Sequence, residues 1–252
     1  MRIAMGVEYD GSAYNGWQKQ NIGLGIQTLM EKALSEVANH QINTICAGRT
    51  DTGVHARCQV IHFDTITERD NYKWLAGVNS NLPPDINVTW VKKVNNDFHA
   101  RFSALKRKYC YKILNQKVRS SLSRHHFWWI YDDLNTNQMQ SGANNIIGKH
   151  DFTSFRAASC QASSPIREIY DIKIQRNDEH IYITLSANAY LQRMVRNIVG
   201  ALVQVGKQEK DPKWMHSVLI SRDRKLAGIA APAHGLSLLT VKYPDEFNIE
   251  FI

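Results

Sequence analysis

The sequence predicts an α+β fold built from two similar halves, each with a mixed, mainly antiparallel sheet and helices packed on it. Two observations lead to this prediction. Segments of alternating apolar residues are interspersed with amphipathic helical segments, and several strands are joined by links short enough for hairpins rather than crossover helices. The order of elements before residue 105 also recurs after it, although no residue-level repeat accompanies it. We therefore expect domains at residues 1–105 and 106–252.

In the first half the predicted order is strand, helix, strand, strand, helix, strand. The first strand is predicted from alternation, and the first helix from apolar residues spaced by three and four. Two short β-like runs follow, joined by a polar segment. An Asn-Ser-Asn turn and two prolines end the second helix before the last strand. The predicted ranges are 3–9, 26–39, 42–47, 59–63, 70–79 and 86–94.

In the second half the same criteria predict a strand, a helix, two strands and a final helix. Their ranges are 108–114, 135–147, 166–175, 180–188 and 191–206.

The composition points to an ordinary globular protein. Of its 252 residues 43% are hydrophobic and 21% charged, values near the globular average. No apolar run approaches the roughly 20 residues that cross a bilayer, and the N-terminus turns acidic before a signal-peptide core could form. The expected location is therefore the cytoplasm, with no membrane association.

The cysteines and histidines do not predict a metal site. Cys46, Cys58, Cys110 and Cys160 include no C-x-x-C pair, which argues against a structural zinc site or a disulfide framework. The ten histidines lack further ligands at metal-binding spacing, and the pair at 125–126 precedes an aromatic run. We expect no metal.

The net positive charge lies entirely in the second half. The chain carries 31 Lys and Arg against 23 Asp and Glu. Residues 1–105 hold ten of each, so residues 106–252 hold 21 basic and 13 acidic residues and the whole net charge of +8. This half is expected to meet a polyanion, with a solvated basic face as the alternative.

The segment 48–56, Gly-Arg-Thr-Asp-Thr-Gly-Val-His-Ala, is the most informative stretch. Two glycines bracket a carboxylate between strands, an arrangement that displays a side chain on a tight loop. A plain turn in which Asp51 bonds local amides is the alternative. Arg49 favours the functional interpretation, because a nearby cation keeps a partly buried carboxylate ionised. Such a carboxylate can act as a nucleophile or stabilise an oxocarbenium-like sugar.

An aspartic protease also uses Asp-Thr-Gly. Such an enzyme requires apolar residues around the triad and a downstream hydrophobic-hydrophobic-Gly. Ile198-Val199-Gly200 matches by letter but lies in a helical pattern, and Arg49 and His55 replace the apolar flanks. The protease interpretation is therefore disfavoured.

Two further segments contain basic side chains of interest, one beside aromatic residues in a predicted strand and one on the face of a predicted helix. In the run 106–111, which leads into the strand predicted at 108–114, Tyr109 and Tyr111 are expected on one face, either as core residues or with one tyrosine stacked on a nucleobase. On the helix 191–206, Arg193 and Arg196 lie opposite or beside the apolar stripe. They could clamp phosphates, one could pair with an active-site carboxylate, or both could be surface arginines.

Taken together, these motifs resemble the tRNA pseudouridine synthase A family over almost the whole chain. Departures from the family pattern fall at Gln192-Arg193 and at Cys110, and concern auxiliary RNA contacts. The matching segments are 9–11, 16–18, 27–34, 47–56, 79, 82–86, 98–102, 107, 109, 111, 151–155, 194–200, 232 and 235–236.

The resemblance implies an isomerase that converts uridines at nucleotides 38 to 40 of the tRNA anticodon stem-loop to pseudouridine. It implies that Asp51 is the catalytic aspartate, that Tyr109 packs under the target base, and that Arg196 pairs with the aspartate. Arg49 would help to evict the base. The implied fold has two halves whose sheets join into one central sheet, and the implied assembly is a homodimer without cofactor or metal.

The remaining RNA contacts are expected from Lys106, Arg107 and Arg193, beside Tyr109. Because the glycosidic bond is exchanged within the substrate, an external redox or phosphate cofactor has no task. Two other classes stay open at this point: a tRNA-binding module without catalysis, which would not need the Arg49 and Asp51 loop, and an aspartyl hydrolase, which would not need RNA.

Overall fold

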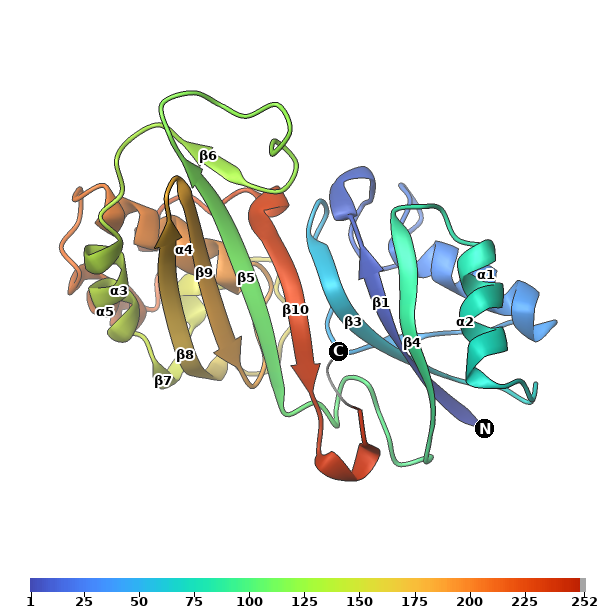
Figure 1. Cartoon of the computed structure of the whole chain (residues 1–252). Helices are drawn as coiled ribbons and strands as arrows, with labels where there is room; N and C mark the ends of the chain where they lie inside the picture. Colours follow the sequence, from blue (N-terminus) through green and yellow to red (C-terminus); the bar gives the residue numbers. More distant parts are fainter. Residues whose placement is uncertain (250–252) are drawn as a thin grey trace. The chain divides into compact units, whose positions relative to one another are not determined.

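The computed structural model describes residues 1–249, and the chain divides into two compact units (Figure 1). The first unit contains residues 1–107 together with the segment that begins at residue 237, and the second contains residues 108–236. Each unit is a mainly antiparallel sheet with helices packed on it, so the predicted α+β class is confirmed.

The sheet of the first unit has β1 (Arg2–Tyr9) between β3 (His55–Asp64) and β4 (Ile86–Val94), and both pairings are antiparallel. Two short strands share the other edge of β3. The strand β10 (Leu236–Lys242) pairs in parallel with the start of β3, and β2 (Ile45–Cys46) pairs in antiparallel fashion near its end. The polar segment predicted between two strands forms the loop from β2 to β3 only as far as residue 54, since β3 begins at His55, four residues before the predicted start at residue 59.

Two helices pack on this sheet, α1 (Ile26–Ala38) and α2 (Asn71–Ser80) (Figure 1). The apolar positions spaced by three and four along α1 are buried, as the sequence predicts, except Leu29, which is half-buried. At the start of α2 the Asp70 side chain accepts a hydrogen bond from the backbone N–H of Lys73 at 2.8 Å, a normal helix cap. The helix α1 ends at Ala38, and the next residue, Asn39, is left-handed with φ of 57°.

The strand predicted at 42–47 is shorter than expected because a buried carboxylate takes its donors. Glu31 on α1 accepts hydrogen bonds from the backbone N–H of Thr44 at 2.9 Å and from its hydroxyl at 3.2 Å. A backbone amide that bonds a side chain is lost to the sheet. Only Ile45–Cys46 remains paired with β3.

In the second unit the sheet order is β5, β9, β8, β7, with the short strand β6 parallel to the end of β5. The pairs of β7 with β8 and of β8 with β9 are antiparallel. The bounds are Lys106–Asn115 for β5, Trp128–Ile130 for β6, Gly148–Asp151 for β7, Ile166–Asn177 for β8 and His180–Ala187 for β9.

Three helices belong to the second unit: α3 (Thr136–Asn144), α4 (Met194–Gly206) and α5 (Trp214–Ser221). The helix α4 is the most deeply buried of them along its apolar stripe. It starts three residues later than predicted, because Arg193 adopts a left-handed conformation with φ of 60° and cannot belong to the helix.

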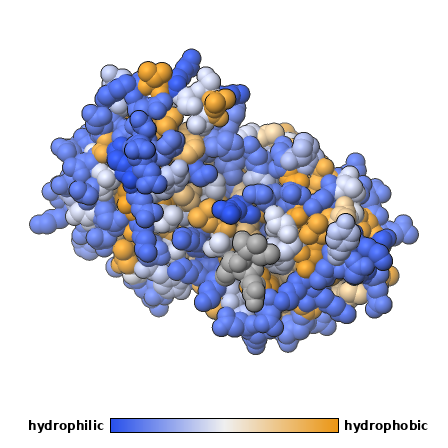
Figure 2. Space-filling view, viewed as in Figure 1, coloured by the Kyte–Doolittle hydropathy of each residue, from blue (hydrophilic) through white to orange (hydrophobic). Residues whose placement is uncertain are grey.

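Hydrophobic residues on the face seen in Figure 2 lie in separate patches among hydrophilic ones. Among residues 1–249, no helix has both the length and the hydropathy that a bilayer crossing requires.

Candidate functional site

Asp51 is half-buried in the loop between β2 and β3, and the chain turns tightly just after it. The backbone N–H of Val54 donates to the carbonyl of Asp51 at 3.1 Å, and Gly53 has φ of 77°. This left-handed conformation favours glycine. Arg49 is exposed two residues earlier. The side chain of Asp51 therefore sits on a turn whose backbone is fully specified.

The middle of this loop is anchored at Thr50 by the segment that follows β1. The buried hydroxyls of Thr50 and Tyr9 are hydrogen-bonded at 2.8 Å, and the N–H of Trp17 donates to the carbonyl of Thr50 at 3.0 Å. Gly16 has φ of +83°, and a Cβ there would lie 2.6 Å from the Thr50 carbonyl oxygen. Backbone packs on backbone immediately before Asp51.

The start of the loop is held by two buried polar side chains. Gln59 on β3 donates from Nε2 to the carbonyl of Gly48 at 2.5 Å and accepts the N–H of Gly48 at 3.4 Å. Arg107 donates from Nη2 to the carbonyl of Ala47 at 3.0 Å. Both side chains are more than nine-tenths buried. They satisfy loop carbonyls that would otherwise be costly to bury.

Arg107 has little donor capacity left for a ligand. Its guanidinium also donates to the carbonyls of Ala104 at 3.0 Å and Arg101 at 2.6 Å. The expectation that Arg107 binds RNA stays a prediction. Its burial favours a different task, which is to position the loop that carries Asp51.

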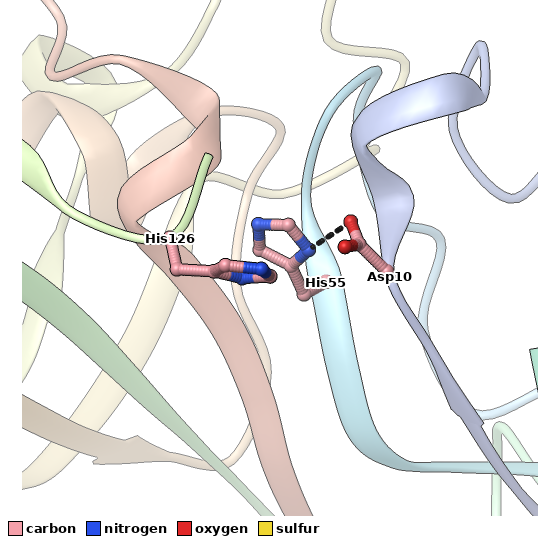
Figure 3. A group of neighbouring side chains, drawn as sticks. All are labelled: Asp10, His55 and His126. Atoms are coloured by element: carbon pink, nitrogen blue, oxygen red, sulfur yellow. Dashed lines mark ion pairs between the residues drawn. The ribbon is translucent and has the colours of Figure 1, made fainter. Parts of the chain in front are cut away.

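The end of the loop is fixed by His55, the first residue of β3 (Figure 3). Its Nδ1 lies 3.0 Å from a carboxylate oxygen of Asp10 and accepts the N–H of Gly11 at 3.0 Å. A Cβ on Gly11 would lie 2.0 Å from the carbonyl oxygen of Val54. His126, also drawn there, belongs to the second unit.

In the second unit the two tyrosines of β5 are both buried but differ in their surroundings. The hydroxyl of Tyr111 donates to the carbonyl of Pro232 at 2.7 Å, which gives it a structural role. The ring of Tyr109 meets the ring of Tyr190 edge to face, with centroids 5.2 Å apart and an interplanar angle of 86°. The two tyrosines expected on one face therefore have separate roles.

Tyr190 was not among the residues that the sequence singled out. Its hydroxyl is buried and has no hydrogen-bond partner among the described residues, and burial raises its pKa well above the ordinary value. The sequence contains no signal of this burial, because a tyrosine before a helix can lie on the surface as well as in the core. Gln59 was missed too, although a glutamine between buried apolar positions of a strand is such a signal.

Arg196 is half-buried on the first turn of α4 and is bonded to the segment that runs alongside the helix. Its Nε donates to the carbonyl of Ala231 at 2.7 Å, and the N–H of Ala231 donates back to the carbonyl of Arg196 at 2.9 Å. One turn further on, a Cβ at Gly200 would lie 1.9 Å from the carbonyl oxygen of Ile229. The Arg196 side chain is thus oriented by its hydrogen bond to the backbone of the neighbouring segment.

The expected phosphate contacts lie in different surroundings. Arg193 is exposed at the start of α4, whereas Lys106 is half-buried at the start of β5. Asp51 belongs to the first unit, and Tyr109 and Arg196 to the second. The meeting of these three side chains, including the ion pair between Asp51 and Arg196, therefore stays a prediction.

A carboxylate held in this way suits chemistry at a sugar carbon. Its backbone is bonded before and after Asp51, so little reorganisation precedes the reaction. The carboxylate can attack an electrophilic carbon or remove a proton.

Comparison with known proteins identifies relatives along the whole chain. The sequence pattern of the family "tRNA pseudouridine synthase" matches residues 5–103 and 143–244. A protein of Colwellia psychrerythraea named tRNA pseudouridine synthase A is 48% identical over 99% of this chain and 96% of its own length. Proteins of the same name from Coxiella burnetii and an Enterobacter species are 48% and 47% identical, over 98% of this chain and 95% and 92% of their own.

Proposed function

Since this chain belongs to the tRNA pseudouridine synthase family, we propose that it isomerises uridine to pseudouridine in tRNA. The expected targets are the uridines at nucleotides 38 to 40 of the anticodon stem-loop, in line with the motif resemblance. The observation that carries the proposal is the loop of Asp51, whose backbone is fixed from Ala47 to His55 by buried partners.

The reaction needs no second substrate. The bond between C1′ of the ribose and N1 of the uracil breaks, a bond between C1′ and C5 forms, and the proton of C5 is replaced by a proton on N1. All heavy atoms stay within the nucleotide and no electrons are gained or lost. Asp51 supplies the carboxylate, either as a nucleophile at C1′ or as a base on the sugar. We accordingly expect neither cofactor nor metal.

Three other side chains are given roles around this carboxylate. Tyr109 packs under the target base, and its hydroxyl is the candidate acceptor for the C5 proton. Arg196 is the proposed ion-pair partner of Asp51, as the motif resemblance implies. Arg49, exposed on the Asp51 loop, helps to evict the base from its stack.

The second unit supplies most of the attraction for RNA. Residues 108–236 hold 18 Lys and Arg against 10 Asp and Glu, which is the entire net charge of +8. Flipping a base out of its stack costs roughly a few kcal/mol, and phosphate contacts must offset that cost. The proposed contacts are Arg193 in this unit and Lys106 and Arg107, the last two residues of the first unit's 1–107 segment. Arg107 is the least available of the three because it is buried.

We also propose that the protein works as a homodimer in the cytoplasm. The support is the family resemblance together with a basic surface suited to a polyanion. Light scattering coupled to size-exclusion chromatography, without and with tRNA, tests the dimer: a mass near twice 28.8 kDa is expected, and a single-chain mass would contradict it.

The deciding experiment incubates the purified protein with a tRNA transcript that contains uridine 39, and maps pseudouridine. The Asp51→Asn variant keeps the shape but loses the negative charge, so turnover is expected to vanish while tRNA affinity stays within a few-fold of wild type. Asp97→Asn, the same change at an exposed site of the first unit, is the matched control and should react normally. Turnover by Asp51→Asn within about tenfold of wild type would refute the assignment.

The alternatives give different products in the same assay. A binding module without catalysis would bind tRNA and leave every uridine unchanged. A hydrolase that acts on tRNA would release free uracil, and one that does not need RNA would neither bind nor change the transcript.

A further inference from the structure

The loop that joins β5 to β6 contains a group of basic side chains for which the proposed mechanism has no use. Residues 116–127 include Lys117, Arg119, Arg124 and two histidines, and no acidic residue. The loop continues directly from β5, the strand that carries Tyr109. A ligand bound by this loop would therefore be held by the segment that follows the strand of Tyr109, the proposed base-stacking residue.

A pocket of about 280 Å³ opens in this loop, lined by Arg119, Ser120, Ser121 and Arg124. Two guanidinium groups and two hydroxyls are all hydrogen-bond donors. Arginine forks of this kind suit the paired oxygens of a phosphate, and charge-assisted hydrogen bonds are the strongest that side chains form. The composition of the pocket thus matches an oxyanion.

Neither arginine is neutralised within the part of the chain that the structure describes. The only side-chain bond of Arg124 runs from Nη1 to the carbonyl of Ser121 at 2.8 Å, and Arg119 has no ion pair. The neighbouring Lys117, in contrast, pairs with Asp133 at 3.1 Å. Two cationic side chains without an acidic partner among the described residues line this pocket, so it favours a negatively charged ligand.

The loop is also ordered before any ligand binds. The N–H of Ser123 donates to Ser120 Oγ at 3.1 Å, and the carbonyl of Ser123 accepts the N–H groups of His126 and Phe127, each at 3.0 Å. Nε1 of Trp129 donates to the carbonyl of Gln116 at 2.9 Å and closes the loop. A preorganised loop loses little conformational entropy on binding.

Exposed apolar residues beside the pocket indicate the size of the ligand. Leu122 is 93% exposed and Val118 is 72% exposed, one on each side of Ser120 and Ser121 in the sequence. A free phosphate ion would leave both apolar side chains in water. A polynucleotide presents riboses and bases next to each phosphate, and these can cover apolar side chains.

We propose that Arg119, Arg124 and the hydroxyls of Ser120 and Ser121 bind a phosphodiester group of the RNA backbone. The subsite holds the RNA by its backbone and is indifferent to sequence. It rests on the proposed function in so far as the RNA is the tRNA substrate.

The test compares two double variants in tRNA binding across a series of salt concentrations. Arg119→Gln/Arg124→Gln removes the subsite charge, and Lys149→Gln/Lys173→Gln removes two exposed charges elsewhere in the second unit. Loss of one phosphate contact should flatten the slope of log affinity against log salt by about 0.7 to 0.9. Affinity should fall several-fold for every tRNA tested, the single-turnover rate at saturating enzyme should stay normal, and the lysine control should match wild type. Circular dichroism melting checks that both variants fold.

An unchanged slope and affinity in the arginine variant would overturn the subsite, as would an equal loss in the lysine control. Thermal-shift measurements with inorganic phosphate and pyrophosphate test the alternative ligand, a small free phosphate instead of an RNA phosphodiester. If these anions stabilise wild type but not the arginine variant, and that variant binds tRNA normally, the pocket takes a small phosphate and the RNA assignment is wrong. Absence of pseudouridine from the wild-type reaction would instead contradict the proposed function, whatever the slopes.

Discussion

The two units of this chain are both sheets with helices packed on them, yet they differ in charge. Residues 1–107 and 237–252 hold 13 basic and 13 acidic residues, whereas residues 108–236 hold 18 and 10. The first unit, here called the neutral unit, carries the fixed loop of Asp51. The second, here called the basic unit, carries the whole net positive charge, including the exposed Arg119, Arg124 and Arg193. Chemistry at one atom depends on the position of one carboxylate, whereas attraction of a polyanion depends on how many charges a surface carries.

The prediction with the largest expected effect tests whether the basic unit only binds tRNA or also takes part in proton transfer. Tyr109→Phe keeps the ring against Tyr190 but removes the hydroxyl, so we expect the single-turnover rate to fall by roughly 10²- to 10⁴-fold with nearly normal tRNA affinity. Tyr109→Leu, which also removes the ring, serves as the comparison. If Tyr109→Phe reacts like wild type and only Tyr109→Leu is slow, the basic unit contributes stacking and no proton transfer.

The next prediction tests the fixed loop of the neutral unit. In Gly16→Ala the new Cβ meets the Thr50 carbonyl at 2.6 Å while φ stays at +83°. We expect a loss of about 1–3 kcal/mol in the free energy of unfolding, together with slower turnover as Asp51 shifts. Gly23→Ala is the matched control, since φ there is +90° but the nearest atoms belong to the flexible Asn15 side chain. Urea titration and single-turnover assays should separate the two variants, and equal activity in both would disprove the locking role.

Acid should destabilise the neutral unit through His62. Burial, with like charge from Arg2 and His99, lowers the pKa of His62 from 6.5 to about 4. The unfolded chain therefore binds a proton that the folded chain does not, and stability falls as pH drops from about 6.5 towards 4. Nδ1 of His62 accepts the N–H of Ala100 at 3.1 Å, so His62→Gln keeps an acceptor. Melting temperatures across this range should vary less in the variant, and parallel curves would contradict the prediction.

The smallest expected effect is an increase in the free energy of unfolding. Tyr190→Phe removes a buried hydroxyl without a partner and keeps the edge-to-face contact with Tyr109. An unsatisfied buried polar group costs about 1–3 kcal/mol, so we expect a modest rise, of up to about 1 kcal/mol, in unfolding free energy by urea titration. A loss of stability would mean that the hydroxyl has a partner in the folded protein.

Strongly periodic segments were predictable, and segments defined by distant partners were not. The strand Ile86–Val94 has the predicted bounds, and α1 differs by one residue at its end. The strands β6, β7 and β10 and the helix α5 were not predicted. The two pairing steps between β10 and β3 involve residues some 180 positions apart, Ser237 with His55 and Leu238 with Ala56, and local pattern carries no information about such a partner.

The sequence predicted that the candidate site lies on a tight loop, but not which side chains hold that loop in place. Glycines around Asp51 indicated a tight turn, which the structure confirms. The burial of Arg107 could not be foreseen, because its acceptors are three backbone carbonyls, at Ala47, Arg101 and Ala104. Carbonyls have no sequence signature, so an arginine that stabilises a loop and one that binds phosphate look alike in the sequence.

The parallel strand β10 also affects the order of events during synthesis. On the ribosome, β1 to β4 emerge long before residue 237, and until then the start of β3 lacks the neighbour that covers its edge. An uncovered edge strand can pair with another nascent chain. The neutral unit is thus expected to be most prone to aggregation while the basic unit is being translated.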